Sequence, residues 1–148
     1  MLPAQLHGPG YHGCGGAGAT AAVHALAVTR DGRWIASGSA DGTARLWDTT
    51  TWQPAAVLSP GATVYGVAFT PDGTRLACAC ANNTIRLWDV ATRQAVGDLH
   101  GHGAYTHQAA FNPDGTRLVS VSGDLTVRIW NRLSRRERAA GERAPTAN

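Results

Sequence analysis

The sequence of 148 residues has no lysine, and its charge is unevenly distributed. All thirteen basic residues are arginines, and against ten acidic residues they give a formal net charge of +3. Residues 1–127 hold seven arginines and eight aspartates, whereas residues 128–148 hold six arginines, Glu137 and Glu142. The basic character therefore belongs to the C-terminal end. The lack of lysine beside 18 glycines is typical of GC-rich coding and does not by itself indicate phosphate contacts.

Cysteines and long apolar runs are also scarce. The three cysteines, Cys14, Cys78 and Cys80, are an odd number, which argues against a disulfide framework and favours a reducing, cytoplasmic location. No apolar run reaches the ~18 residues of a membrane helix. Residues 1–7 lack the basic stretch and apolar segment of a secretory signal. With 43% hydrophobic and 16% charged residues, we expect a folded core.

Three segments of the chain repeat one another. Trp47, Trp88 and Trp130 are separated by 41 and 42 residues, and Asp-Gly pairs beginning at 31, 72 and 114 keep the same intervals. Each unit reads as short apolar runs separated by polar turns, and the run ending at the tryptophan alternates with the period of a strand. A further run follows at 53–58 and 94–99. The pattern predicts an antiparallel meander of four strands per unit.

The repeat resembles the WD40 family over about residues 18–131. The Trp-Asp signature of that family stands at Trp47-Asp48 and Trp88-Asp89, and the third unit has Trp130-Asn131. The Gly-His pair stands at Gly101-His102. The resemblance implies an all-β fold, a partial β-propeller of three four-stranded blades at about 18–58, 59–99 and 100–131.

The resemblance also implies a buried hydrogen-bond relay in each blade, from a histidine through a hydroxyl and an aspartate to the signature tryptophan. The third unit has the full set, His102, Ser120, Asp124 and Trp130. The first unit keeps Ser37, Asp41 and Trp47 but lacks the histidine. The second keeps Trp88, with Asn82 and Cys78 in the other places. We expect the first two blades to be looser than the third, because an incomplete polar network orders a fold less.

The two ends of the chain differ from the repeats. Residues 1–17 are glycine-rich and are predicted to be flexible, and the Arg-rich residues 132–148 are predicted to be disordered. Arg138 and Gly141 stand where the second unit has Val96 and Leu99, so the third blade is expected to lack a proper outer strand.

Three blades are too few to close a propeller, and the two end faces of such an arc would be open. Two main interpretations remain. The chain is a piece of a longer WD40 signalling or scaffold protein without an autonomous function, or it self-associates, for instance as a six-bladed dimer. Missing blades supplied by another chain are a further alternative.

Catalytic chemistry is not indicated. The aspartates of the repeats are explained as turn residues, glutamate occurs only near the C-terminus, and no nucleophile is paired with a base. Cys78 and Cys80 occupy the columns of Ser37 and Ser39 and are predicted to be small core residues, without further ligands for a metal. We predict no enzymatic activity, no cofactor and no metal.

His24, Tyr65 and His107 share one column, near the start of the first strand of each unit. The simpler interpretation is that they are solvated or packed between blades. In the family this end borders the face where partners dock, so the alternative is a shared recognition surface. The predicted function is a non-catalytic protein–protein interaction or scaffold module. Association with nucleic acid or an acidic partner through residues 132–148 is a further alternative.

Overall fold

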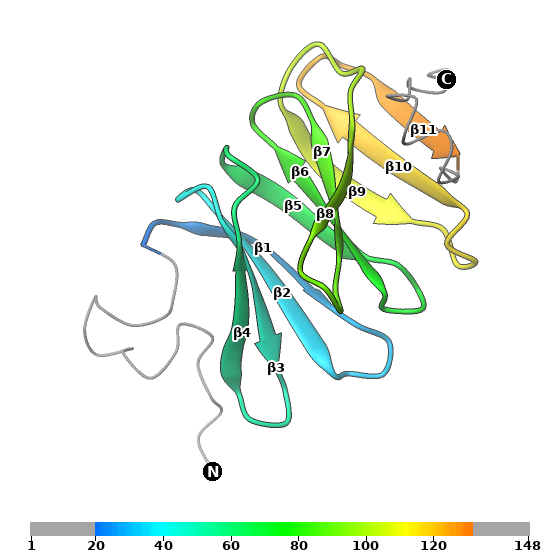
Figure 1. The fold of residues 1–148 in the computed structure, drawn as a ribbon. Helices are drawn as coiled ribbons and strands as arrows, with labels where there is room; N and C mark the ends of the chain where they lie inside the picture. Colours follow the sequence, from blue (N-terminus) through cyan, green and yellow to red (C-terminus); the bar gives the residue numbers. More distant parts are fainter. Residues whose placement is uncertain (1–19, 132–148) are drawn as a thin grey trace.

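A computed structural model of the chain describes residues 20–131. These residues form three antiparallel sheets and no helix (Figure 1). The predicted all-β fold is therefore confirmed. Both predicted end segments, 1–17 and 132–148, fall outside the described residues.

Each sheet is a meander of consecutive strands, which we call blades 1, 2 and 3. Blade 1 contains β1 (Val23–Val28), β2 (Trp34–Ser39), β3 (Ala44–Asp48) and β4 (Gln53–Leu58). Blade 2 contains β5 (Val64–Phe69), β6 (Arg75–Cys80), β7 (Ile85–Asp89) and β8 (Ala95–Leu99). Blade 3 contains β9 (Thr106–Phe111), β10 (Arg117–Ser122) and β11 (Val127–Asn131). Up to residue 131 blade 3 has three strands, and the place of a fourth lies outside the described residues.

The Asp-Gly turns join the first and second strands of each blade as predicted. Gly32, Gly73 and Gly115 have φ values of 73°, 71° and 72°, which side chains with a Cβ rarely adopt. In the second turn the Asp72 carboxylate accepts hydrogen bonds from the hydroxyls of Thr70 (2.6 Å) and Thr74 (2.7 Å). Backbone conformation and side-chain hydrogen bonds therefore specify the same reversal.

The three blades stand face to face in an open arc. Their innermost strands run side by side, with β1 next to β5 and β5 next to β9 (Figure 1). This is the arrangement of consecutive propeller blades, and among the described residues it does not close into a ring.

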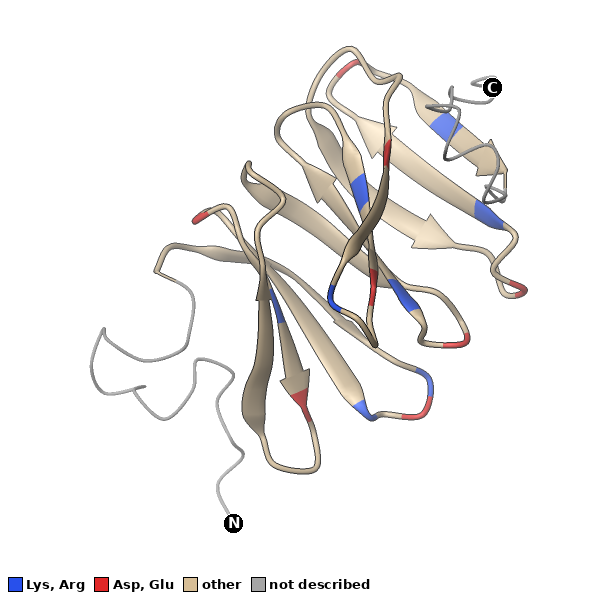
Figure 2. Cartoon of the chain, viewed as in Figure 1, with Lys and Arg blue, Asp and Glu red and all other residues tan. Residues whose placement is uncertain are grey.

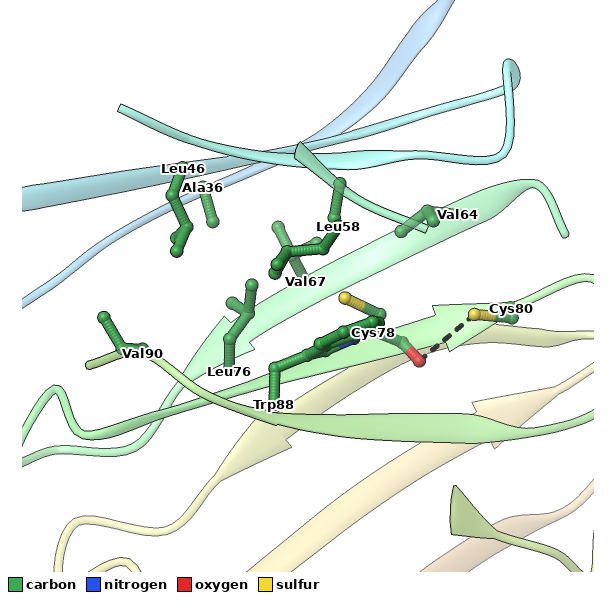
Figure 3. Close-up of a cluster of buried hydrophobic side chains, with 11 residues drawn as sticks. Ala36, Leu46, Leu58, Val64, Val67, Leu76, Cys78, Cys80, Trp88 and Val90 are labelled. Carbon is green, nitrogen blue, oxygen red and sulfur yellow. Dashed lines mark hydrogen bonds between the residues drawn. The ribbon is translucent and has the colours of Figure 1, made fainter. Parts of the chain in front are cut away.

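Two apolar clusters hold the blades together. At the 1/2 interface, Ala36, Leu46 and Leu58 of blade 1 meet Val67, Leu76 and Trp88 of blade 2 (Figure 3). At the 2/3 interface, residues of blade 2 meet Ala109, Leu118 and Trp130 of blade 3. The blade 2 side consists of Ala77, Ala79, Ile85, Leu87 and Leu99. Because blade 2 contributes to both clusters, its second strand, β6, is buried almost throughout.

Small residues set the distance between the blades. A Cβ added to Gly38 on β2 would lie 2.5 Å from Cγ1 of Val64 on β5. That is closer than real side-chain contacts, and Val64 is fully buried, so it has little room to move.

We predict that Gly38→Val forces blades 1 and 2 apart and lowers the free energy of unfolding by about 1–3 kcal/mol, the range typical of overpacking. Urea denaturation followed by tryptophan fluorescence measures this change. Ala55→Val, at an exposed position of β4, is the matched control and should be close to neutral. Equal denaturation midpoints for Gly38→Val and the parent chain would contradict the close approach.

Candidate functional site

The relay of blade 3 is complete in the structure. Nε2 of His102 lies 2.8 Å from Oγ of Ser120, and Nδ1 lies 2.9 Å from Oδ2 of Asp124. Nε1 of Trp130 donates to the same Ser120 oxygen at 2.8 Å. With the imidazole proton on Nδ1, the serine hydroxyl donates to His102 while accepting from Trp130, so each of these side-chain polar groups in the relay has a partner. The relay ties the loop before β9 to β10 and β11.

Asp124 anchors the outer end of this relay. Its carboxylate accepts from the hydroxyl of Thr126 at 2.6 Å and from the backbone N–H of Gly103 at 2.9 Å. These hydrogen bonds, Thr126 foremost, with that of His102, hold the pKa of Asp124 well below its usual range. The carboxylate therefore stays ionised wherever the fold is stable.

Blade 1 has part of the relay. Nε1 of Trp47 donates to Oγ of Ser37 at 3.0 Å, and Asp41 accepts from the backbone N–H of Thr20 at 3.0 Å. Burial alone would raise the pKa of Asp41, but hydrogen bonds from Thr43 and Thr20 outweigh it and lower that pKa to about 2. The position that matches His102 is residue 19, which lies outside the described residues.

Blade 2 departs furthest from the relay. Cys78 stands where the other blades have serine, and Nε1 of Trp88 is buried without a hydrogen-bond partner among the described residues. The expectation that blades 1 and 2 are looser than blade 3 stays a prediction. It assumed comparable surroundings, whereas blade 2 is packed between the other two.

The two cysteines of β6 are core residues, as their columns predict. Cys78 and Cys80 are both fully buried in the 1/2 interface, and Sγ of Cys80 donates to the Cys78 carbonyl (Figure 3). Burial raises the pKa of the Cys78 thiol well above its ordinary value and that of Cys80 to about 11. Both thiols are therefore protonated and poorly nucleophilic at neutral pH. Cys14 lies outside the described residues.

The structure brings His24, Tyr65 and His107 together at one end of the blades. The ring of Tyr65 lies 5.4 Å from that of His24 and 6.1 Å from that of His107, between centroids. Tyr105, which the repeat comparison did not single out, joins them at 5.5 Å from Tyr65. We call these four residues the ring surface. Tyr105 has no aromatic equivalent in the other units, so the only signal for it was its place two residues before His107.

A β-bulge places three of these rings. In each innermost strand the pairing register shifts at this column, between Val23 and Ala25, between Val64 and Gly66, and at the matching point of β9. His24, Tyr65 and His107 are the extra residues of the three bulges. A bulge turns its extra side chain away from the regular alternation of the strand. The repeated bulge therefore directs one ring per blade to the same end.

Glycines make room for this packing. A Cβ on Gly66 would lie 3.0 Å from the carbonyl oxygen of His107, and one on Gly123 would collide with the ring of Tyr105. Tyr65 is half-buried at the centre, and the other three rings are exposed. The backbone beneath the ring surface therefore holds its side chains in position, and the rings remain accessible to a partner.

Two aspartates lie at this end of the blades, and one of them, Asp41, is paired with Arg45 of β3 at 3.7 Å. Asp41 and Asp124 lie in the turns before β3 and β11, at the same end of the sheets as the ring surface, because Ser39 pairs with Val23 and Ser122 with Thr106. Figure 2 shows that acidic positions occur mainly in the turns at the two ends of the blades. Because both have a lowered pKa, both Asp41 and Asp124 are ionised at ordinary pH values, and the charge of Asp41 is balanced by Arg45.

Other kinds of site are not indicated within residues 20–131. They contain no group of three or more histidine, cysteine or acidic residues placed to hold a metal ion. Nor do they form a helix with the length and apolar character needed to cross a membrane. The acidic side chains of the described repeats are occupied in turn hydrogen bonds, as with Asp31 and Thr29 at 2.7 Å, or in the ion pair of Asp98 with Arg86.

Successive antiparallel meanders packed face to face, each with a tryptophan near the end of its third strand, define a protein of the β-propeller class. A comparison with family models identifies the particular family. The model "WD domain, G-beta repeat" matches at residues 13–48, 52–89 and 93–131, and the chain belongs to the WD40 repeat family. No curated protein matched the sequence.

Ser120 is predicted to be the polar residue of the fold whose removal lowers the stability most. Ser120→Ala leaves Trp130 and His102 without their buried partner, so we expect the free energy of unfolding to fall by about 1–3 kcal/mol. Urea denaturation measures it. Ser37→Ala is the matched control, since it removes only the bond to Trp47 and should cost less. A larger loss in Ser37→Ala than in Ser120→Ala would contradict the relay.

Acid is predicted to weaken the fold between about pH 4 and pH 2. All eight aspartates of the described residues have a pKa below the ordinary 3.8, seven because hydrogen bonds in turns favour the charged form and Asp98 on β8 because it is paired with Arg86. The unfolded chain binds more protons than the folded chain in this range, so stability is lost as the pH falls. Urea midpoints at pH 5 and pH 2.5 measure the loss.

The matched variant for the acid effect is Asp41→Asn with Asp124→Asn. It removes two of the eight titrating groups, and we expect a lower stability at pH 5 but a smaller further loss on acidification. If the urea midpoint falls between pH 5 and pH 2.5 by the same amount in the variant as in the parent chain, these two turns do not contribute to the acid effect.

Proposed function

We propose that the chain is a non-catalytic protein-interaction module and that the ring surface is where a segment of a partner protein docks. WD40 repeats indicate an interaction or scaffold module in general. The observation that supports this particular surface is the contact of aromatic and imidazole rings from all three blades around Tyr65.

The chemistry of the ring surface favours a partner segment with basic or aromatic side chains. Tyrosine and histidine rings offer flat, rigid faces for aromatic stacking or for a cation. The ionised Asp124 at the same end adds negative potential, whereas Asp41 is paired with Arg45. Because β-bulges and glycines hold the rings in place, little side-chain entropy would be lost on binding. A cytoplasmic location stays a prediction.

The proposal predicts that Tyr65→Ala weakens partner binding about tenfold or more, as expected for a central aromatic hot spot. Peptides selected by display against the parent chain provide the probe, and their dissociation constants are measured by calorimetry. His24→Ala and His107→Ala are expected to have smaller effects. The selected peptides should be enriched in arginine, lysine or aromatic residues.

The matched controls are Arg30→Ala and Gln94→Ala, exposed residues in turns at the opposite end of the blades. Circular dichroism and a thermal melt establish that Tyr65→Ala keeps its fold. The proposal fails if selected peptides bind the folded Tyr65→Ala variant as tightly as the parent chain, or if the turn variants are the ones that lose binding.

A further inference from the structure

Two exposed apolar surfaces lie at opposite ends of the row of blades. On β1, Ala25 and Ala27 pack toward blade 2, so Leu26 and Val28 point to the other face, where they are 59% and 53% exposed. Val23 is exposed there as well. We call these three residues the blade 1 face. Farther out on the same side Ile35 and Trp47 are buried, whereas Val57 on β4 is 51% exposed.

The second surface lies on blade 3. On β10, Leu118 and Ser120 face blade 2, so Val121 points the other way and is 37% exposed. Leu125 in the next turn is 95% exposed, and Val127 on β11 is exposed as well. We call Val121, Leu125 and Val127 the blade 3 face.

The blade 1 face corresponds to one half of an interface that the chain already contains. By the repeat spacing, Leu26 and Val28 match Val67 and Phe69 of blade 2, which pack on blade 1 in the 1/2 interface. They also match Ala109 and Phe111 of blade 3, which pack in the 2/3 interface. In blades 2 and 3 these columns are covered by the preceding blade.

The blade 3 face corresponds to the other half. Val121 matches Gly38 of blade 1, which lies directly against Val64 and Val67 of blade 2. It also matches Ala79 of blade 2, which is fully buried at the 2/3 interface. Val127 likewise matches Ala44 and Ile85, both fully buried in these interfaces. In blades 1 and 2 these columns are covered by the following blade.

We propose that the blade 3 face of one copy packs on the blade 1 face of a second copy, and that two such head-to-tail contacts close a six-bladed ring. A second copy carries both matching halves, so one contact repeated twice covers both surfaces of both chains. Six blades lie within the range in which propellers close. At each contact Val121 meets Val23 and Leu26 of the second copy, as Gly38 meets Val64 and Val67 within the chain.

A pair of charged and aromatic residues supports the same pairing independently. Across the 1/2 interface the guanidinium of Arg93 lies over the ring of Trp34, 5.3 Å from its centroid. The position of Trp34 in blade 3 is occupied by Arg117, and the position of Arg93 in blade 1 is occupied by Trp52. Both are exposed. A head-to-tail contact would therefore bring Arg117 to Trp52 of the second copy, with the two roles exchanged.

The turns that carry this pair have the same shape. Trp52 and Arg93 have φ values of 57° and 62°, in the left-handed region that non-glycine residues seldom adopt. The backbone N–H groups of Trp52 and Arg93 donate to the carbonyls of Asp48 and Asp89, at 2.7 Å and 2.9 Å. The two turns therefore have the same backbone shape, and Trp52 occupies in blade 1 the position that Arg93 occupies in blade 2.

The contact between copies is bulkier than the contacts within the chain. The Gly38 column changes to alanine in blade 2 and to valine in blade 3. With Val121 against Val23 and Leu26, the two copies stand further apart than blades 1 and 2 do. This makes position 121 the most informative place for substitutions. The inference is separate from the proposed function, because it concerns the sides of the sheets and not the ring surface.

Light scattering on a size-exclusion column tests the proposal with the full chain. The expected mass is twice 15.5 kDa. Leu26→Asp and Val121→Arg, made singly, should each halve that mass, because each places one unpaired charge in an apolar contact. The chain that carries both substitutions should recover the dimer, since every contact then pairs a guanidinium with a carboxylate. Ala95→Asp, at an exposed position of β8, is the matched control and should remain a dimer.

A cross-link covers the case in which the charged variants fail to fold. In a Cys14→Ser background, Leu26→Cys with Val121→Cys should form a covalent dimer under oxidising conditions. Blade 2 separates the two positions within one chain, so the disulfide has to join two chains. In addition, Arg117→Ala should raise the dissociation constant of the dimer about two- to five-fold, and Arg30→Ala should leave it unchanged.

Several outcomes would overturn the proposal. They are a monomeric parent chain, a dimer that persists in both single charge variants, or a co-purifying protein in place of the second copy. Loss of the dimer in Leu26→Asp but not in Val121→Arg would indicate a symmetric contact of like faces. Filaments would overturn the closed ring, because they would show that the head-to-tail contact forms without closing.

Discussion

The packing of one blade face on the next is the constraint on which the rest of the structure depends. A four-stranded meander with two apolar faces buries little by itself, and each blade is stable only because a neighbour covers it. This explains the sequence of β6, which has apolar or small side chains at consecutive positions and not in alternation, since both of its faces are covered. It also explains the small residues of the middle strands, because Gly38 and Ala79 allow the next innermost strand to approach closely.

Much of this fold could be predicted from the sequence, because repeat spacing and turn chemistry are local signals. The Asp-Gly pairs predict positive φ at Gly32, Gly73 and Gly115, and the structure has it at all three. The columns of Cys78 and Cys80 predict buried small residues, since the aligned serines lie on the same strand face. Other features could not be predicted in this way. The bulges at His24, Tyr65 and His107 depend on how two strands pair, which a single column does not encode. Tyr105 belongs to no column of the repeat, so only the structure places it beside Tyr65.

The three blades share a backbone but differ in how their interiors are satisfied. Blade 3 connects His102, Ser120 and Trp130 through hydrogen bonds, whereas blade 2 buries Trp88 beside two cysteines. The difference follows from position. Blade 2 is covered by apolar side chains on both faces, so it depends less on polar order. Blade 3 has one described neighbour, and its relay fastens the loop before β9 to the sheet by interactions that need no second covering surface.

The two proposed surfaces are geometrically independent, and this has a consequence for binding. The ring surface lies at the ends of the strands, whereas the blade 1 and blade 3 faces are the sides of sheets, so a partner on one does not obstruct the other. Within the chain, each bulge residue lies beside the bulge residue of the next blade, as His24 lies beside Tyr65 and Tyr65 beside His107. A head-to-tail contact would continue this order by placing His107 of one copy beside His24 of the second. Closure would therefore join two ring surfaces into one continuous circle of aromatic and imidazole rings. Because two linked sites raise the effective concentration of the second contact, such a circle would favour partners that present two docking segments.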